Sequence, residues 1–120
     1  MKISVYRIED NNGRGPWGSL SCNVADDKED EFWRTLREVG ININPIWEDC
    51  PNFLHGIHLC AFDNLSMTID MFAPIFHLLK QYSWRIAEYQ IDDKHAIINR
   101  RSHQVAFEKE ATELKEYIPV

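Results

Sequence analysis

Prolines in the middle of the chain set the strongest limit on what it can fold into. Pro45 and Pro51 exclude a continuous helix through the segment ININPIWEDCPNFLHG, because proline has no N–H group and clashes with the preceding turn. Pro74 should end one helix and begin another, since proline is tolerated in a first turn but not in a helix interior. Residues 41–56 are therefore expected to be irregular, and two short helices are expected to meet at Pro74.

Strands are predicted on both sides of this region. Residues 3–8 alternate in polarity, with Ile3, Val5 and Arg7 on one face and Tyr6 on the other. The segments GIHLCAF and WRIAEYQI indicate two further strands. AIIN-RRS-HQVAF indicates a β-hairpin over residues 96–107.

Helices are expected over residues 27–39, 63–72 and 74–82, and a short polar helix over 108–117. Asp63 or Asn64 should cap the second of these, and Gly40 should stop the first. The prediction is a single α+β domain over residues 1–120, with a mostly antiparallel sheet and three or four short helices. A chain of 120 residues is long enough to bury a core of this kind.

Composition argues against several classes of protein. The net charge of −6 disfavours a nonspecific nucleic-acid binder, because phosphate contacts need a basic surface. The sequence has neither an apolar stretch of about 18 residues, as a membrane span requires, nor the pattern of a secretory signal peptide. We therefore expect a cytoplasmic protein with reduced cysteines and no membrane partner.

Acidic residues concentrate in DDKEDE, residues 26–31, and again in FEKEATELKE near the end of the chain. Runs of this kind usually form solvated faces of helices. The alternative is an acidic surface that binds a basic patch of a protein or imitates nucleic acid.

The densest group of candidate metal ligands is CPNFLHGIHLC, which contains Cys50, His55, His58 and Cys60. Two thiolates and two imidazoles could hold zinc, but the short Cys-x-x-Cys spacing of structural sites is missing. Buried cysteines and a hydrogen-bonded histidine are the alternative. Cys60 beside a histidine could also be a nucleophile, although burial in an apolar strand would raise its pKa and make it inert.

The loop GRGPWG follows the first strand and differs from a P-loop, because it has no Lys-Ser/Thr. It could bring Arg14 close to Arg7, and two guanidinium groups could then clamp a diphosphate. The alternative is a tight structural turn. An arginine inside an otherwise apolar strand must in any case find a partner or reach water.

Four segments together resemble a group of small uncharacterised proteins encoded by bacteriophages and prophages. They are YRIEDNNGRGPW, PIWED, HLCAFDNL…IDMF and RIAEYQI…HQVAFEKE, and they span most of the chain. This resemblance implies a phage accessory protein that acts in the bacterial host cell. It implies no particular biochemical activity for this chain.

The order of segments also resembles, more distantly, that of small ADP-ribosyltransferases. The resemblance implies that Arg7 binds the diphosphate or ribose of NAD, with Tyr6 or Phe62 stacking on the nicotinamide. The strand from His58 would line that pocket, and Gln104 would take the place of the late acidic residue. A glutamine supplies only a dipole where a glutamate would supply charge, so no catalytic residue is assigned and enzymatic activity is left open.

Three hypotheses follow. The first is a protein that binds a host protein through an acidic surface and so inhibits a bacterial defence system. Trp17, Trp33 and Trp47 are its candidate anchors, and the alternative for each is packing into the core. The second is an NAD- or nucleotide-binding protein whose Arg7, His58 and Gln104 share one cleft with Tyr6. The third is a zinc-stabilised module. The second would need NAD or a nucleotide and the third would need zinc, whereas the first, which is preferred, needs no cofactor.

Overall fold

The computed structural model describes residues 1–10, 33–54 and 56–118. Its six strands are β1 (Lys2–Glu9), β2 (His58–Phe62), β3 (Arg85–Asp92), β4 (Ala96–Ile98), β5 (Gln104–Glu108) and β6 (Glu113–Ile118). The helices are α2 (Ile46–Asp49), α3 (Leu65–Phe72) and α4 (Phe76–Gln81), and residues 33–38 are also helical. Short 3₁₀ turns cover Ala73–Ile75, Asp93–His95 and Lys109–Ala111.

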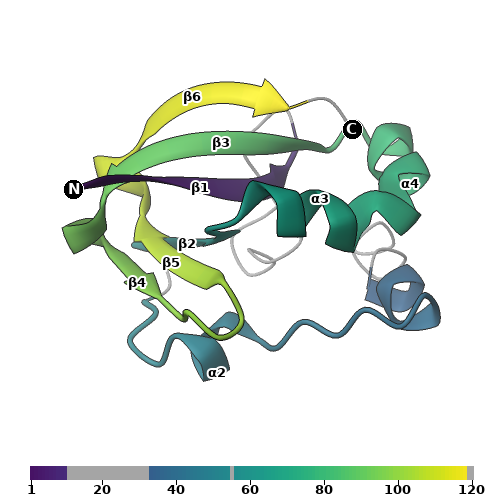
Figure 1. The fold of residues 1–120 in the computed structure, drawn as a ribbon, viewed down its shortest axis with the longest axis horizontal. Helices are drawn as coiled ribbons and strands as arrows, with labels where there is room; N and C mark the ends of the chain where they lie inside the picture. The colour runs from purple at the N-terminus through teal and green to yellow at the C-terminus, as the bar shows by residue number, and fades with distance from the viewer. Residues whose placement is uncertain (11–32, 55, 119–120) are drawn as a thin grey trace.

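All six strands join one sheet in the order β4-β5-β2-β1-β3-β6, and every neighbouring pair is antiparallel (Figure 1). The longest pairing joins β1 to β3, from Lys2 opposite Asp92 to Glu9 opposite Arg85. The predicted α+β class with a mostly antiparallel sheet is confirmed.

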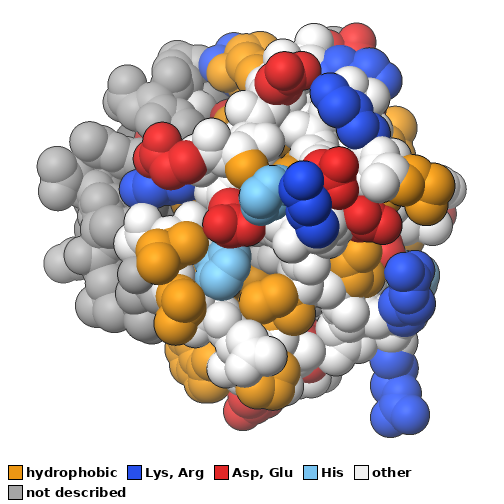
Figure 2. Space-filling view, turned by 90° about the vertical axis from the view of Figure 1, so that its left-hand side faces the viewer, with side chains coloured by type: hydrophobic (Ala, Val, Ile, Leu, Met, Phe, Trp, Pro, Cys, Tyr) orange, Lys and Arg blue, Asp and Glu red, His pale blue; other side chains and the backbone are white. Residues whose placement is uncertain are grey.

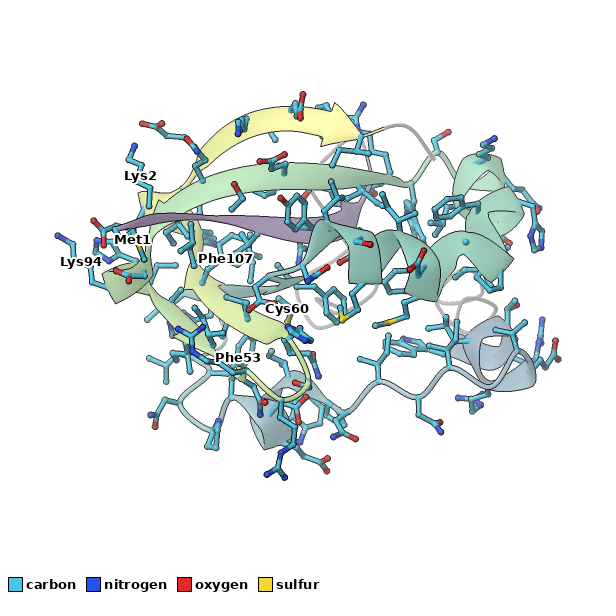
Figure 3. The ribbon with its side chains drawn as sticks, in the orientation of Figure 1. Met1, Lys2, Phe53, Cys60, Lys94 and Phe107 are labelled. Carbon is cyan, nitrogen blue, oxygen red and sulfur yellow. The ribbon has the colours of Figure 1, made fainter. Side chains whose placement is uncertain are left out.

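The sheet must curl strongly, because its connections are too short to cross a flat one. In the strand order, β5, β2 and β1 stand between β4 and β3. Four strand spacings of about 4.8 Å would separate β4 from β3 by about 19 Å in a flat sheet. Four Cα steps, from Asp92 to Ala96, span at most about 14 Å. The turn passes the start of β1, where the amide of Asp93 donates to the carbonyl of Met1 over 2.9 Å. Met1, Lys2 and Lys94 lie together at this end of the sheet (Figure 3).

The inner face of the curl holds its own apolar cluster. Side chains of all strands from β4 to β3 meet there, which is possible only because the sheet wraps around them. Figure 3 shows Phe107 between β1 and β5. The buried members of this inner cluster are Val5, Ala61, Ile91, Val105 and Phe107.

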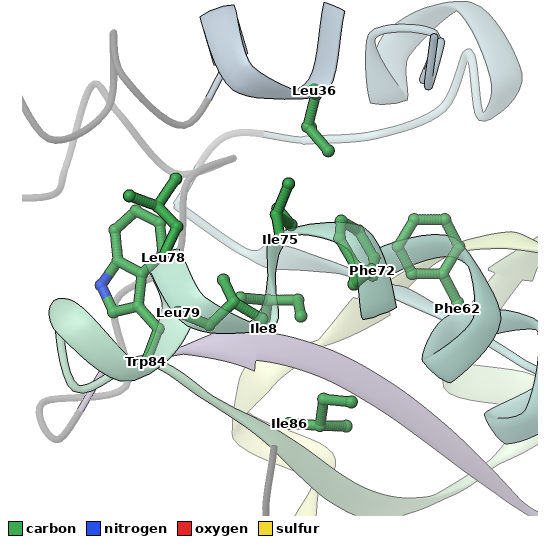
Figure 4. Packing of buried hydrophobic residues seen from close by; sticks show 9 residues of the cluster. All are labelled: Ile8, Leu36, Phe62, Phe72, Ile75, Leu78, Leu79, Trp84 and Ile86. Atoms are coloured by element: carbon green, nitrogen blue, oxygen red, sulfur yellow. The ribbon is translucent and has the colours of Figure 1, made fainter. Parts of the chain in front are cut away.

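The outer face is covered by helices, which bury a second cluster against the sheet (Figure 4). Phe72 of α3 meets Phe62 of β2 edge to face, with their ring centroids 5.9 Å apart. Leu36 reaches the same cluster from the helical residues 33–38. The other buried members of this outer cluster are Ile8, Ile75, Leu78, Leu79, Trp84 and Ile86.

Local signals placed α3 and α4 correctly. The side chain of Asn64 accepts a hydrogen bond from the amide of Met67 over 2.8 Å, as a helix N-cap does. Pro74 lies in the first turn of the 3₁₀ segment that separates α3 from α4. The predicted break at this proline is confirmed.

The polar helix predicted over residues 108–117 is wrong. The chain makes a 3₁₀ turn at Lys109–Ala111 and then pairs as β6 with β3. Leu114 and Tyr117 are three apart, which is a helical spacing, but an irregularity in the β3–β6 register makes the same spacing fit a strand. Glu116 stands opposite Glu88 and Leu114 stands opposite Tyr89, so Lys115 is an extra residue in β6. As a result, Leu114 and Tyr117 lie on the same face of the sheet.

Candidate functional site

Arg7 lies on the inner face of the sheet and is only 2% exposed. Its Nε donates to Glu9 Oε2 over 3.2 Å, and its Nη1 donates to the carbonyl oxygen of Cys60 over 3.0 Å. The guanidinium therefore has partners on its own strand and on β2. The alternative of a hydrogen-bonded, buried arginine is what the structure shows.

Glu9 completes this buried polar cluster. The hydroxyl of Tyr89 donates to the Glu9 carboxylate at 2.8 Å and 2.9 Å from its two oxygens. Burial raises the pKa of Glu9, and the hydrogen bond from Tyr89 and the charge of Arg7 work against that rise. The cluster buries a charged pair inside the sheet. Because Arg7 is only 2% exposed, very little of its side chain is accessible to a ligand.

Gln104 lies on the outer face, opposite Phe62, and is also buried. Its Nε2 donates to the carbonyl of Asn44 over 2.9 Å and to the carboxylate of Asp49. These two bonds fasten the chain around α2 to the start of β5. A pocket of about 100 Å³ adjoins them, and its lining includes Asn44, Asp49, Phe62, Ser102 and Gln104.

His58 lies at the other end of the β2–β5 pair, opposite Glu108. Its Nδ1 accepts a hydrogen bond from the amide of Leu54 over 2.9 Å. The ring is tilted against Phe53, with centroids 6.0 Å apart. The imidazole thus closes the turn that leads into β2.

The structure does not bring Arg7, His58 and Gln104 into one cleft. Arg7 points to the inner face, whereas His58 and Gln104 belong to the outer face at opposite ends of a five-residue pairing. The physical reason is that side chains of a strand alternate between its two faces. Arg7 therefore lies on the inner face with Val5, whereas Tyr6 lies on the outer face, which is also the face of Gln104. A ligand-binding role for each residue stays a prediction, but a shared cleft is not formed by the described residues.

Tyr6 lines a second pocket, of about 340 Å³, beside the first residues of β1. Asp63 and Arg100 also line it. Burial, and then the nearby charge of Glu88, raise the pKa of Tyr6. Next to this pocket His103 Nδ1 lies 2.8 Å from Asp63 Oδ1, a pair 40 residues apart that no sequence pattern indicated.

Cys50 and Cys60 are buried in one cluster between α2 and the outer face, with Ile46 and Ala106. Burial raises the pKa of Cys60 to about 12, so its thiol is a poor nucleophile at neutral pH. Within the described residues, which exclude His55, no group of three metal-ligating side chains comes together.

The three candidate anchors differ in placement. Trp17 and Arg14 lie outside the described residues. Trp33 is half-buried and packs against the outer cluster. Trp47 of α2 is 58% exposed, and the apolar residues Leu54 and Ile57 that follow α2 are about half exposed too. We refer to these three exposed apolar residues of one short segment, Trp47, Leu54 and Ile57, as the Trp47 surface. Among the three tryptophans considered as anchors, Trp47 is the one that the described part of the chain leaves largely exposed, and no sequence pattern singled out Leu54 or Ile57.

Charges accompany this surface. Glu48 is exposed next to Trp47 in α2. Burial opposes ionisation of Asp49, but hydrogen bonds from neighbouring hydroxyl and amide groups outweigh it and lower the pKa of this carboxyl. In the face that Figure 2 shows, hydrophobic side chains gather in the lower left part, and acidic and basic side chains intermingle above them.

A family model described as Bacteriophage T4 Y00F protein matches residues 1–120. The chain belongs to this family. The resemblance to small phage proteins is thereby confirmed, whereas the comparisons give no support to the resemblance to ADP-ribosyltransferases. Neither a curated protein nor a solved structure matches the chain significantly. No helix among the described residues is long and apolar enough to cross a membrane.

Proposed function

We propose that this member of the phage family is an accessory protein that binds a host bacterial protein through the Trp47 surface. The observation that carries the proposal is the 58% exposure of Trp47. Tryptophan is enriched among residues that dominate binding energy, and truncation of such a residue typically costs about 2 kcal/mol or more. An exposed tryptophan on a helix that is held to the sheet by hydrogen bonds is the feature of this chain that best fits a protein interface.

The local structure presents Trp47 rigidly. Ile46 is buried, so its neighbour Trp47 turns outward from the short helix α2. The end of α2 is tied to the β4–β5 hairpin, because Asn99 Nδ2 donates to the carbonyl of Asp49 over 3.0 Å and Gln104 donates to its carboxylate. An anchor that is already ordered loses less conformational entropy on binding.

The charges next to this anchor specify the kind of partner. Glu48 and Asp49 follow Trp47 directly in α2, and the whole chain has a net charge of −6. A partner with an apolar pocket rimmed by lysine and arginine would complement them, and such complementarity speeds association and makes it sensitive to salt. We extend the proposal to inhibition of a host defence protein, since a small acidic protein of this kind would act by occupying a partner's surface.

Affinity capture from host lysate tests the proposal. Immobilised wild-type chain should retain a specific bacterial protein at low salt and release much of it at high salt. Trp47→Ala should weaken binding of that identified partner at least about tenfold, as loss of a central anchor does. Val39→Ala is the matched control, because Val39 is a similarly exposed apolar residue outside the Trp47 surface.

Both variants alter exposed side chains, so their melting temperatures should stay close to that of the wild type. A captured partner whose affinity is equal for wild type and Trp47→Ala would contradict the proposed surface. Lysates that yield no salt-sensitive partner would contradict the proposed function itself.

A further inference from the structure

The last strand, β6, is an edge of the sheet with an unusually open side. Among the described residues β6 pairs only with β3, and five of its six residues are exposed. Leu114 is 48% exposed and Tyr117 is 38% exposed, although both are apolar enough to favour burial. An edge strand presents unpaired backbone N–H and C=O groups that can pair with another strand.

The bulge in β6 sorts its side chains by face. Leu114 and Tyr117 stand opposite Tyr89 and Ala87 and therefore lie on the inner face. Glu116 stands opposite Glu88 on the outer face. Lys115 is the extra residue, and its Nζ lies 3.2 Å from Glu88 Oε2, which places it on the outer face as well. Lys115 and Glu116 are thus consecutive residues with opposite charges on one face.

We propose that two copies of this chain associate by antiparallel pairing of β6 with β6, around a two-fold axis between Lys115 and Glu116. In this register Leu114 stands opposite Tyr117 of the second copy, and Lys115 stands opposite Glu116 of that copy. A two-fold axis perpendicular to a continuous sheet requires opposed residues to come from the same face. The bulge meets this condition for both pairs.

Neighbouring registers are disfavoured by charge. A shift by one residue in either direction would centre the axis on Lys115 or on Glu116, and each would then face its own copy. Like charges directly opposite each other destabilise strand pairing, whereas opposite charges and apolar pairs stabilise it. Charges and bulges often protect edges from uncontrolled pairing. In β6 the same features select one register.

Sedimentation analysis over a range of concentrations tests the proposal. The wild-type chain should show a reversible monomer–dimer equilibrium. Glu116→Lys should weaken it about tenfold, because two attractive pairs become two repulsive ones. Lys115→Glu should do the same for the same reason. An equimolar mixture of the two variants should dimerise again, since the mixed pair restores both contacts between opposite charges.

Lys115→Glu also places a second carboxylate beside Glu88, so its fold is checked by circular dichroism. Amide hydrogen exchange of the wild type gives a readout without any variant, because amides of β6 should gain protection as concentration rises. Trp47→Ala should dimerise like the wild type, which separates this proposal from the function proposed above. A wild-type chain that remains a monomer at about 1 mM, or variants that associate no better when mixed, would refute the β6 pairing.

Discussion

Arg7 and Glu9 form a charged pair inside the sheet, and each depends on the other. Replacement of Arg7 by Met leaves the Glu9 carboxylate buried without its counter-ion and removes the donor to the Cys60 carbonyl. We expect the free energy of unfolding to fall by about 3–5 kcal/mol, the usual cost of breaking a buried pair. Urea denaturation followed by tryptophan fluorescence measures this loss.

The double variant Arg7→Met, Glu9→Leu is the matched control. It removes both charges, and replacing a whole buried pair by apolar groups is often neutral. Most of the lost stability should therefore return. A double variant less stable than Arg7→Met alone would show that the pair itself is not what stabilises this site.

The need for a partner at Arg7 could be predicted from the sequence, but only part of the answer was local. Glu9 lies two residues along the same strand and so must share the face of Arg7. Tyr89 and the carbonyl of Cys60 come from strands that are distant in the sequence. The chemistry of Arg7 thus predicts that its charge needs a hydrogen-bonding partner, but the order of strands in the sheet determines which distant groups lie close enough to bind it.

At the level of elements, Gln104 fastens α2 to β5. Gln104→Ala removes two hydrogen bonds and leaves the Asn44 carbonyl without this donor. We expect a loss of about 1–3 kcal/mol, and faster amide exchange around α2 than elsewhere. Gln81→Ala, at an exposed position in α4, is the control and should leave exchange unchanged. Uniform acceleration along the chain would contradict a local role.

Elements with strong local signals were predictable, and those determined by pairing were not. Asn64 and Pro74 marked the limits of α3 because caps and proline act within a few residues. The strand β6 was predicted as a polar helix, and only the bulge opposite β3 lets Leu114 and Tyr117, three residues apart, share one face of a strand. A bulge arises from the partner strand, so the sequence of β6 alone cannot reveal it.

At the scale of the whole molecule, the described residues form a sheet with one apolar cluster on its inner face and two on its outer face, a large one under α3 and α4 and a small one under α2. The sequence correctly predicted which residues of β1 point to which face, since alternation is a local property. It could not predict the curl, which follows from a strand order that places three strands between β3 and β4. The cleft predicted to hold Arg7, His58 and Gln104 is not formed, because the sheet places Arg7 on its inner face and the other two residues on its outer face. The order of segments along the chain does not reveal this separation.

Because the inner cluster and the large outer cluster share strands β1, β2 and β3, they should unfold together. Phe72→Ala opens a cavity in the outer cluster and Phe107→Ala opens one in the inner cluster, where both rings are fully buried. Each should lower the free energy of unfolding by about 3–5 kcal/mol. The transitions seen by tryptophan fluorescence, to which Trp84 of the outer cluster contributes, and by far-ultraviolet circular dichroism should still coincide in both variants. If Phe107→Ala separated the two transitions, the inner cluster would be an independent unit, and the curl would not depend on the helices that cover the outer face.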